Sequence, residues 1–173
     1  MKIKKLKINP KVLRKFIELK SEYWLNKDST NCYAYALGLD IPERNIMDGA
    51  YRLGTIGLLK EEIDPCFLLY YSKEARLEKD LKAFKLKYEE VDPNERIEDT
   101  NKYSHFLISL FERDGDFHFL RKSKLDNTWW HKQGWNSAPK NTDDNNEVIT
   151  DPRSAKIDDY KYLKTYKIRF KRS

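Results

Sequence analysis

The sequence predicts an α+β fold in which N-terminal helices pack on one face of an antiparallel β-meander. The chain has 173 residues, which is enough for one domain with a buried core. Apolar residues recur at helical spacing in the first half, whereas after residue 85 they alternate with polar residues, as in β-strands. Helices followed by a run of strands are typical of α+β proteins. We therefore expect a single domain over residues 1–173, with its core at about 28–170.

Three main helices are expected in the first half, and a further short helix should run through Glu62 after a glycine-rich loop. Residues 10–20 carry an apolar stripe, and residues 72–84 carry another behind the capping residue Ser72. Between them, residues 29–37 combine three good capping residues with a short run of small and aromatic residues. Gly38 should end that helix after about two turns.

Five strands are expected in the second half, at residues 86–91, 104–111, 117–121, 128–131 and 160–170. Asp114-Gly115 is a hairpin signal between the second and the third. A long polar loop, residues 132–153, should join the last two. Lysines alternate with aromatic residues in the last strand, which predicts an edge strand because lysine discourages edge-to-edge aggregation.

Charge and composition restrict the possible partners. The net charge is +6, and basic residues gather at both ends: the first twenty residues carry eight Lys or Arg against one Glu. The segment between the ends is acidic, which disfavours nucleic acid as a partner. No segment has the ~20 apolar residues of a membrane span, and none resembles a signal peptide. We expect a cytoplasmic protein with no membrane partner and two free thiols, Cys32 and Cys66.

Cys32 is the candidate nucleophile. It opens the expected helix at residues 29–37, where the positive end of the helix dipole should lower the pKa of a thiol. The alternative, equally supported by position alone, is a small buried hydrophobic residue. All three histidines, His105, His118 and His131, fall in the sheet half, and a histidine facing a cysteine can take its proton.

The expected register decides which histidines can meet. A two-residue turn at Asp114-Gly115 pairs Phe111 with His118 and leaves His105 ~20 Å away along its strand. In the next hairpin, a four-residue turn pairs Lys122 with Asn127 and sets His118 opposite His131. A tight turn at Asp126-Asn127 would instead set His118 opposite Trp135. A longer loop in place of the Asp114-Gly115 turn would bring His105 toward the cysteine, with His118 as its partner.

These residues carry a resemblance. A cysteine at a helix start, then a histidine in one strand and a second polar residue about a dozen positions later, resembles the papain-like superfamily of cysteine peptidases. The pattern is most similar to its NlpC-type and CHAP-type branch, and to uncharacterised bacterial proteins with an Asn-Cys-Tyr segment. The resemblance implies Cys32 as nucleophile, His118 as base and His131 as the orienting residue. Asn31, Trp130 and Trp135 are the candidate substrate-binding residues, although tryptophans in such clusters more often belong to the core or its rim.

The sequence thus predicts a cysteine hydrolase that cleaves an amide or peptide bond in a peptide, a protein or a peptidoglycan-like substrate. The first alternative is a catalytically inert module on the same scaffold, whose basic ends contact an acidic partner. No cofactor and no metal are expected, because the Cys and His residues lack zinc-site spacing and no glycine-rich phosphate loop is present.

Overall fold

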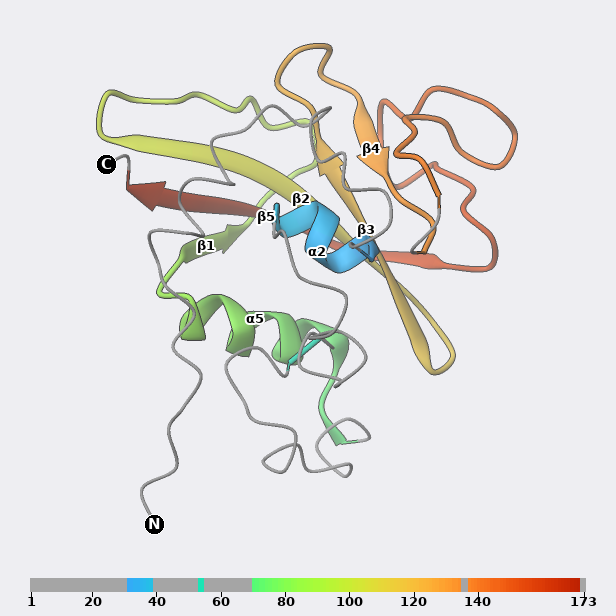
Figure 1. Ribbon diagram of the computed structural model, residues 1–173, viewed down its shortest axis with the longest axis horizontal. Coiled ribbons are helices and arrows are strands. Elements are labelled where there is room, and N and C mark those ends of the chain that lie inside the picture. Colours follow the sequence, from blue (N-terminus) through green and yellow to red (C-terminus); the bar gives the residue numbers. More distant parts are fainter. Residues whose placement is uncertain (1–30, 39–52, 55–69, 135–136, 172–173) are drawn as a thin grey trace.

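The computed structural model describes residues 31–38, 53–54, 70–134 and 137–171, and two helices and five strands lie in these ranges (Figure 1). Their bounds are Cys32–Leu37 for α2, Lys73–Ala83 for α5, Lys87–Glu90 for β1, Tyr103–Arg113 for β2, Asp116–Lys122 for β3, Trp129–His131 for β4 and Lys161–Lys171 for β5. The strands form one sheet in the order β1-β5-β2-β3-β4, and every neighbouring pair is antiparallel. The expected α+β class, with an antiparallel sheet, is confirmed. The expected helices at residues 10–20 and through Glu62 lie outside the described residues.

The last strand does not lie at the edge, so that prediction is wrong. β5 is inserted between β1 and β2, and only β2, β3 and β4 follow one another as a meander. Its lysines are compatible with this place because acidic side chains lie beside them: Lys164 pairs with Glu90 at 2.9 Å, and Lys167 pairs with Glu95. The basic C-terminal strand is thus partly neutralised within the fold.

The sheet separates two apolar clusters. Both helices cover one face, and α2 crosses the strands near the centre of Figure 1. The core on this face includes Tyr33, Leu37, Leu77, Leu81, Phe106, Ile108, Leu110, Phe119, Tyr166 and Ile168. The opposite face has no helix among the described residues and is covered by the chain between β4 and β5. Its buried members are Leu107, Phe111, Leu120, Trp129, Ile149 and Ile157.

Local capping and one buried carboxylate fix the helices. Ser72 caps α5 by accepting a hydrogen bond from the backbone N–H of Ala75, as the sequence predicts. Asp80 on α5 is fully buried and accepts hydrogen bonds from the Tyr33 hydroxyl (2.7 Å) and the Gly54 backbone N–H (2.6 Å). This carboxylate therefore ties α5 to α2. Neither described helix has the length and apolar composition needed to cross a bilayer.

The two hairpins differ in how well the sequence predicts them. Arg113 pairs with Asp116 around Asp114-Gly115, and Phe111 pairs with His118, as expected. In the next hairpin Lys122 pairs with Trp129, so Leu120 rather than His118 lies opposite His131. Both expected registers of this hairpin are wrong, because the connection spans six residues and closes with a hydrogen bond from Ser123 N–H to Thr128 C=O.

Candidate active site

Cys32 opens α2 and lies against the backbone of β3. Asn31 caps the helix through a 2.8 Å bond from the Ala34 N–H to its side-chain oxygen, and the Cys32 thiol contacts the Phe117 carbonyl oxygen at 4.0 Å. β4 pairs with β3 only from Leu120 onward. The thiol therefore occupies the edge of β3 that the neighbouring strand leaves open.

Burial dominates the acidity of this thiol. Only 8% of Cys32 is exposed, and desolvation raises its pKa to about 12, with a smaller upward contribution from the charge of Asp116. The backbone N–H groups of Phe119, Tyr33 and Cys32 oppose this rise, because they favour the thiolate. The expectation that the helix dipole lowers the Cys32 pKa is therefore wrong for this conformation, since the cost of burying the charge exceeds the gain from the amides.

His118 and His131 come together despite the shifted register. Nε2 of His118 lies 2.9 Å from Nδ1 of His131, and the two rings are almost perpendicular. The two residues are diagonal neighbours, since His131 lies directly opposite Leu120. Diagonal side chains on adjacent strands are close enough for aromatic rings to meet. The juxtaposition of the two histidines is present, although the directly opposed pairing expected from the sequence is not.

A backbone carbonyl determines where the protons of this pair lie. Nε2 of His131 is 2.9 Å from the carbonyl oxygen of Thr142, which can only accept, so His131 carries its proton on Nε2. Nδ1 of a neutral His131 is then an acceptor, and His118 must donate to it from Nε2. Nδ1 of His118 is therefore the unprotonated ring nitrogen and carries the free lone pair. It has no hydrogen-bond partner among the described residues.

Both histidines are neutral in the folded protein. Burial lowers the pKa of His118 to about 3, and the neighbouring His131 lowers it further, while Asp116 and Asp144 act in the opposite direction. Burial also lowers the pKa of His131, and the Thr142 carbonyl opposes that shift. At neutral pH the site therefore holds a thiol and two imidazoles rather than a thiolate–imidazolium pair.

The thiol and the His118 ring start from different faces of β3. Phe117 and Phe119 pack against Tyr33 of α2, with ring centroids 6.2 and 4.9 Å apart. Because side chains alternate along a strand, His118 projects toward the opposite face. The expected hydrogen bond between Cys32 and His118 is not formed, and the thiol bonds the Phe117 carbonyl instead. The thiol contacts β3 at Phe117, and His118 is the next residue of this strand.

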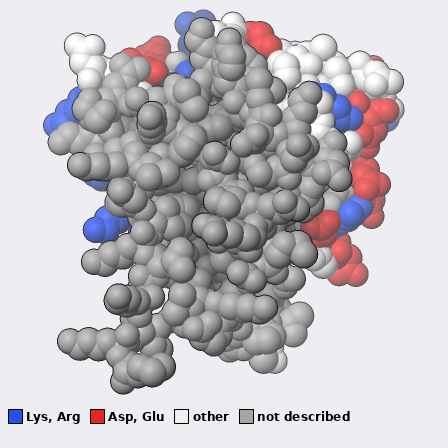
Figure 2. Space-filling view, in the orientation of Figure 1, with Lys and Arg blue, Asp and Glu red and all other residues white. Residues whose placement is uncertain are grey.

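Tyr160 and Asp116 also belong to the site, although no pattern in the sequence pointed to them. The Tyr160 ring lies 5.4 Å from the His118 ring, and its hydroxyl donates to Asp116 at 2.5 Å. Arg113 stacks on Tyr160 at 4.4 Å and pairs with Asp116 and Asp158. Along the right-hand edge of Figure 2, acidic side chains lie next to basic ones. Forty-four positions separate Asp116 from Tyr160, so no local pattern could have joined them.

The other candidate residues lie as follows. His105 lies on β2 opposite Arg169. Phe111, which faces His118, is six positions farther along the same strand, as the first hairpin predicts. Trp130 is half-buried on β4, and the side-chain oxygen of Asn31 is engaged as a helix cap. Trp135 lies outside the described residues. No group of three or more His, Cys, Asp or Glu side chains that could hold a metal occurs within the described segments.

No family model, no curated protein and no solved structure matches the chain. The resemblance to the papain-like superfamily therefore stays a prediction.

Proposed function

We propose that this protein is a cysteine hydrolase that cleaves an amide or peptide bond, with Cys32 as nucleophile, His118 as general base and His131 as the orienting residue. One observation supports this proposal most strongly. The chain of hydrogen bonds from His118 through His131 to the Thr142 carbonyl leaves the His118 lone pair on Nδ1, which is the form that a general base requires.

The reaction proceeds by acyl transfer. Cys32 attacks the substrate carbonyl while its proton passes to Nδ1 of His118, and the S–C bond forms as the C=O π bond opens to an oxyanion. The N–H groups of Cys32, Tyr33 and Phe119, which point toward the sulfur, are the donors available to the oxyanion. His118 then gives its proton to the departing amine. Water, activated by the same imidazole, releases the acid from the thioester and restores the thiol.

The neutral resting site determines how the proton moves. With the Cys32 pKa near 12 and the His118 pKa near 3, transfer before attack is unfavourable, so attack and transfer occur together. Cys32 must first leave the Phe117 carbonyl, which requires rotation of the thiol about its Cα–Cβ bond toward His118. Catalytic hydrogen bonds are often loose without substrate, so the resting contact is compatible with this role.

A catalytically inert binding module is the second candidate. The burial of Cys32 and its bond to a backbone carbonyl favour it, because an inert cysteine packs as a small apolar residue. The two candidates differ in whether His118 assists the thiol.

The first prediction concerns the pH profile of Cys32 alkylation by iodoacetamide, measured in a Cys66→Ser background so that one thiol reports. General-base assistance gives a rate that stays nearly constant between pH 5 and 8, because His118 is neutral throughout this range. We expect His118→Ala to lower this rate by roughly 10²–10⁴-fold and His131→Ala to lower it less. His105→Ala is the matched control and should leave it unchanged.

A rate that rises tenfold per pH unit through this range, with the same values in all three histidine variants, would identify an unassisted thiol and exclude the hydrolase proposal. Circular dichroism of each variant verifies that the fold is retained. A panel of fluorogenic peptide amides, with Cys32→Ala as the inactive reference, then identifies the bond that is cleaved.

A further inference from the structure

A second group of basic side chains lies in the sheet, away from Cys32. Lys87 on β1 is directly opposite Arg169 on β5, which is directly opposite His105 on β2. Residues paired in this way project to the same face. Like charges placed directly opposite one another destabilise a sheet, and Lys87 and Arg169 are such a pair. The arrangement becomes favourable when an anion lies between them.

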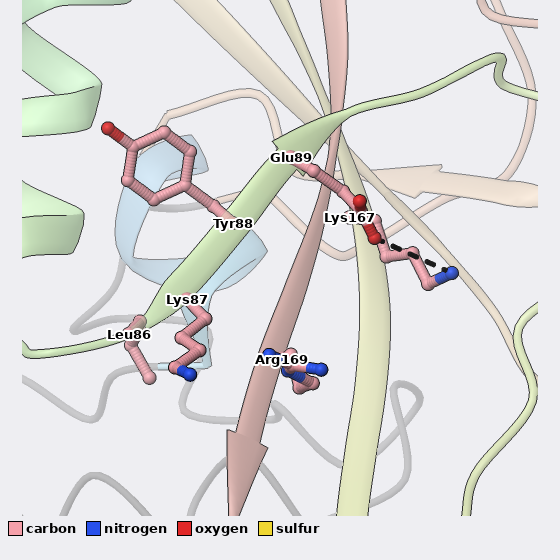
Figure 3. Close-up of a pocket in the computed structure, with 6 residues that line it drawn as sticks. All are labelled: Leu86, Lys87, Tyr88, Glu89, Lys167 and Arg169. Atoms are coloured by element: carbon pink, nitrogen blue, oxygen red, sulfur yellow. Dashed lines mark ion pairs between the residues drawn. The ribbon is translucent and has the colours of Figure 1, made fainter.

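A pocket of about 340 Å³ opens at this row (Figure 3). It is lined by Leu86, Lys87, Tyr88, Glu89, Lys167 and Arg169. Lys167 already pairs with Glu89 at 3.8 Å and with Glu95, so its charge is compensated. The Tyr88 ring points away in Figure 3, and its hydroxyl donates to Glu78 of α5.

Lys87 and Arg169 remain as the uncompensated cations of the pocket. Neither has an acidic partner among the residues that the structure describes. The Arg169 guanidinium lies 4.9 Å from the centre of the Tyr103 ring, which limits its freedom. Stacking on an aromatic face leaves the in-plane N–H groups of a guanidinium available for bidentate bonds to an oxyanion.

The next residue in the row is also incompletely satisfied. His105 is only 9% exposed, and its Nδ1 is buried without a hydrogen-bond partner in the described part of the chain. Burial lowers the pKa of His105, and the nearby Lys167 and Arg169 lower it further, while the Glu98 carbonyl and Asp99 oppose the shift. The surroundings of His105 therefore carry an excess of positive charge, which a bound anion would reduce.

We propose that Lys87 and Arg169 bind the phosphate group of a small phosphomonoester in this pocket. The charge of a phosphomonoester near pH 7, about −1.5 to −2, matches the two cations, whereas a carboxylate would neutralise only one. The pocket volume lies at the lower end of the ~300–1,000 Å³ typical of small-molecule sites, so it suits a phosphate with a modest organic group. This site is separate from the proposed cysteine chemistry and does not depend on it.

The test is calorimetric titration of the full chain with glycerol 2-phosphate, inorganic phosphate and acetate at constant ionic strength. We expect saturable binding of both phosphates and little binding of acetate. Lys87→Gln and Arg169→Gln should each lower the affinity for both phosphates by about tenfold, which corresponds to about 1.4 kcal/mol. Arg169→Lys should lose part of this affinity because it keeps the charge but not the bidentate geometry.

Lys161→Gln is the matched control, since it removes an exposed lysine from the other end of β5 and should leave binding unchanged. Equal weakening by Lys161→Gln would show diffuse attraction and overturn the proposal, as would the absence of saturation with either phosphate. One further outcome would overturn the small-molecule assignment in favour of a nucleic-acid backbone. In it, a single-stranded oligonucleotide binds more tightly than glycerol 2-phosphate, and its binding is lost in the same two variants.

Discussion

At the scale of single residues, burial and the amide groups around the sulfur act in opposite directions on Cys32. Helix-terminus effects stabilise a charge by ~0.3–1 kcal/mol, and up to ~2 kcal/mol in partly buried sites. The rise in pKa from 9.0 to about 12 corresponds to about 4 kcal/mol against the thiolate. Because α2 has only six residues, its end cannot offset this cost, and any activation of the thiol must come from a base.

The proton positions in the histidine pair provide a test at this scale that does not need a substrate. We expect ¹⁵N-edited long-range NMR spectra at pH 7 to show both His118 and His131 protonated on Nε2, because the Thr142 carbonyl orients the pair. His131→Ala removes the acceptor of His118 and should give a mixture of tautomers there. A proton found on Nδ1 of His118 in the unmodified protein would contradict its role as base.

At the scale of elements, α2 is too short to be stable alone, since isolated helices need roughly 12–15 residues. All six of its residues are buried, so packing against the sheet holds it. Asn31 closes its N-terminus. At its other end Gly38 has a φ of 71° and donates to the Ala34 and Tyr35 carbonyls. This left-handed conformation favours glycine, which explains why the helix ends there.

Variants of two capping residues distinguish an effect on global stability from an effect on the position of the Cys32 thiol. We expect Asn31→Ala and Ser72→Ala each to lower the free energy of unfolding by about 1 kcal/mol, because each removes one side-chain cap. Urea denaturation measures this change. Only Asn31→Ala should also alter the alkylation rate of Cys32, since α5 does not carry the thiol. An identical effect of both variants on that rate would show that it follows global stability alone.

At the scale of the whole molecule, the sheet buries histidines in their neutral form. The pKa values of His105, His118 and His131 are all lowered, with burial as the largest cause in each. In the unfolded chain His118 binds a proton from about pH 6.5 downward, whereas in the folded protein it does so only near pH 3. The stability that neutral His118 contributes is therefore fully present above pH 6.5 and is lost as the pH falls toward 3.

This linkage predicts an acid-sensitive fold. Between pH 7 and 4, His118 alone should lower the free energy of unfolding by about 3 kcal/mol. The carboxylates with lowered pKa values, such as Asp116 and Asp143, lose their contribution at lower pH, below their ordinary values near 4. In His118→Gln, the free energy of unfolding measured by urea denaturation should change less with pH over this range. A dependence equal to that of the unmodified protein would show that His118 is solvated in solution.

Local sequence signals predicted the elements well, for a physical reason. Caps, turns and periodicity act over a few residues, so the start of α5 at Ser72, the end of α2 at Gly38 and the Asp114-Gly115 turn could all be read from the chain. The predicted register of the second hairpin was wrong because Ser123 and Thr128 close a six-residue connection, in which no single pair of residues specifies the turn.

By itself, the sequence determined the class of fold, the strands and the candidates Cys32, His118 and His131. Only the tertiary structure decided that β5 lies inside the sheet, because its lysines meet acidic partners from β1 and the following loop. It also decided the diagonal meeting of His118 and His131, and it brought Tyr160 to the site. These arrangements join residues far apart in the chain, and their energies depend on burial and on contacts that no local pattern contains.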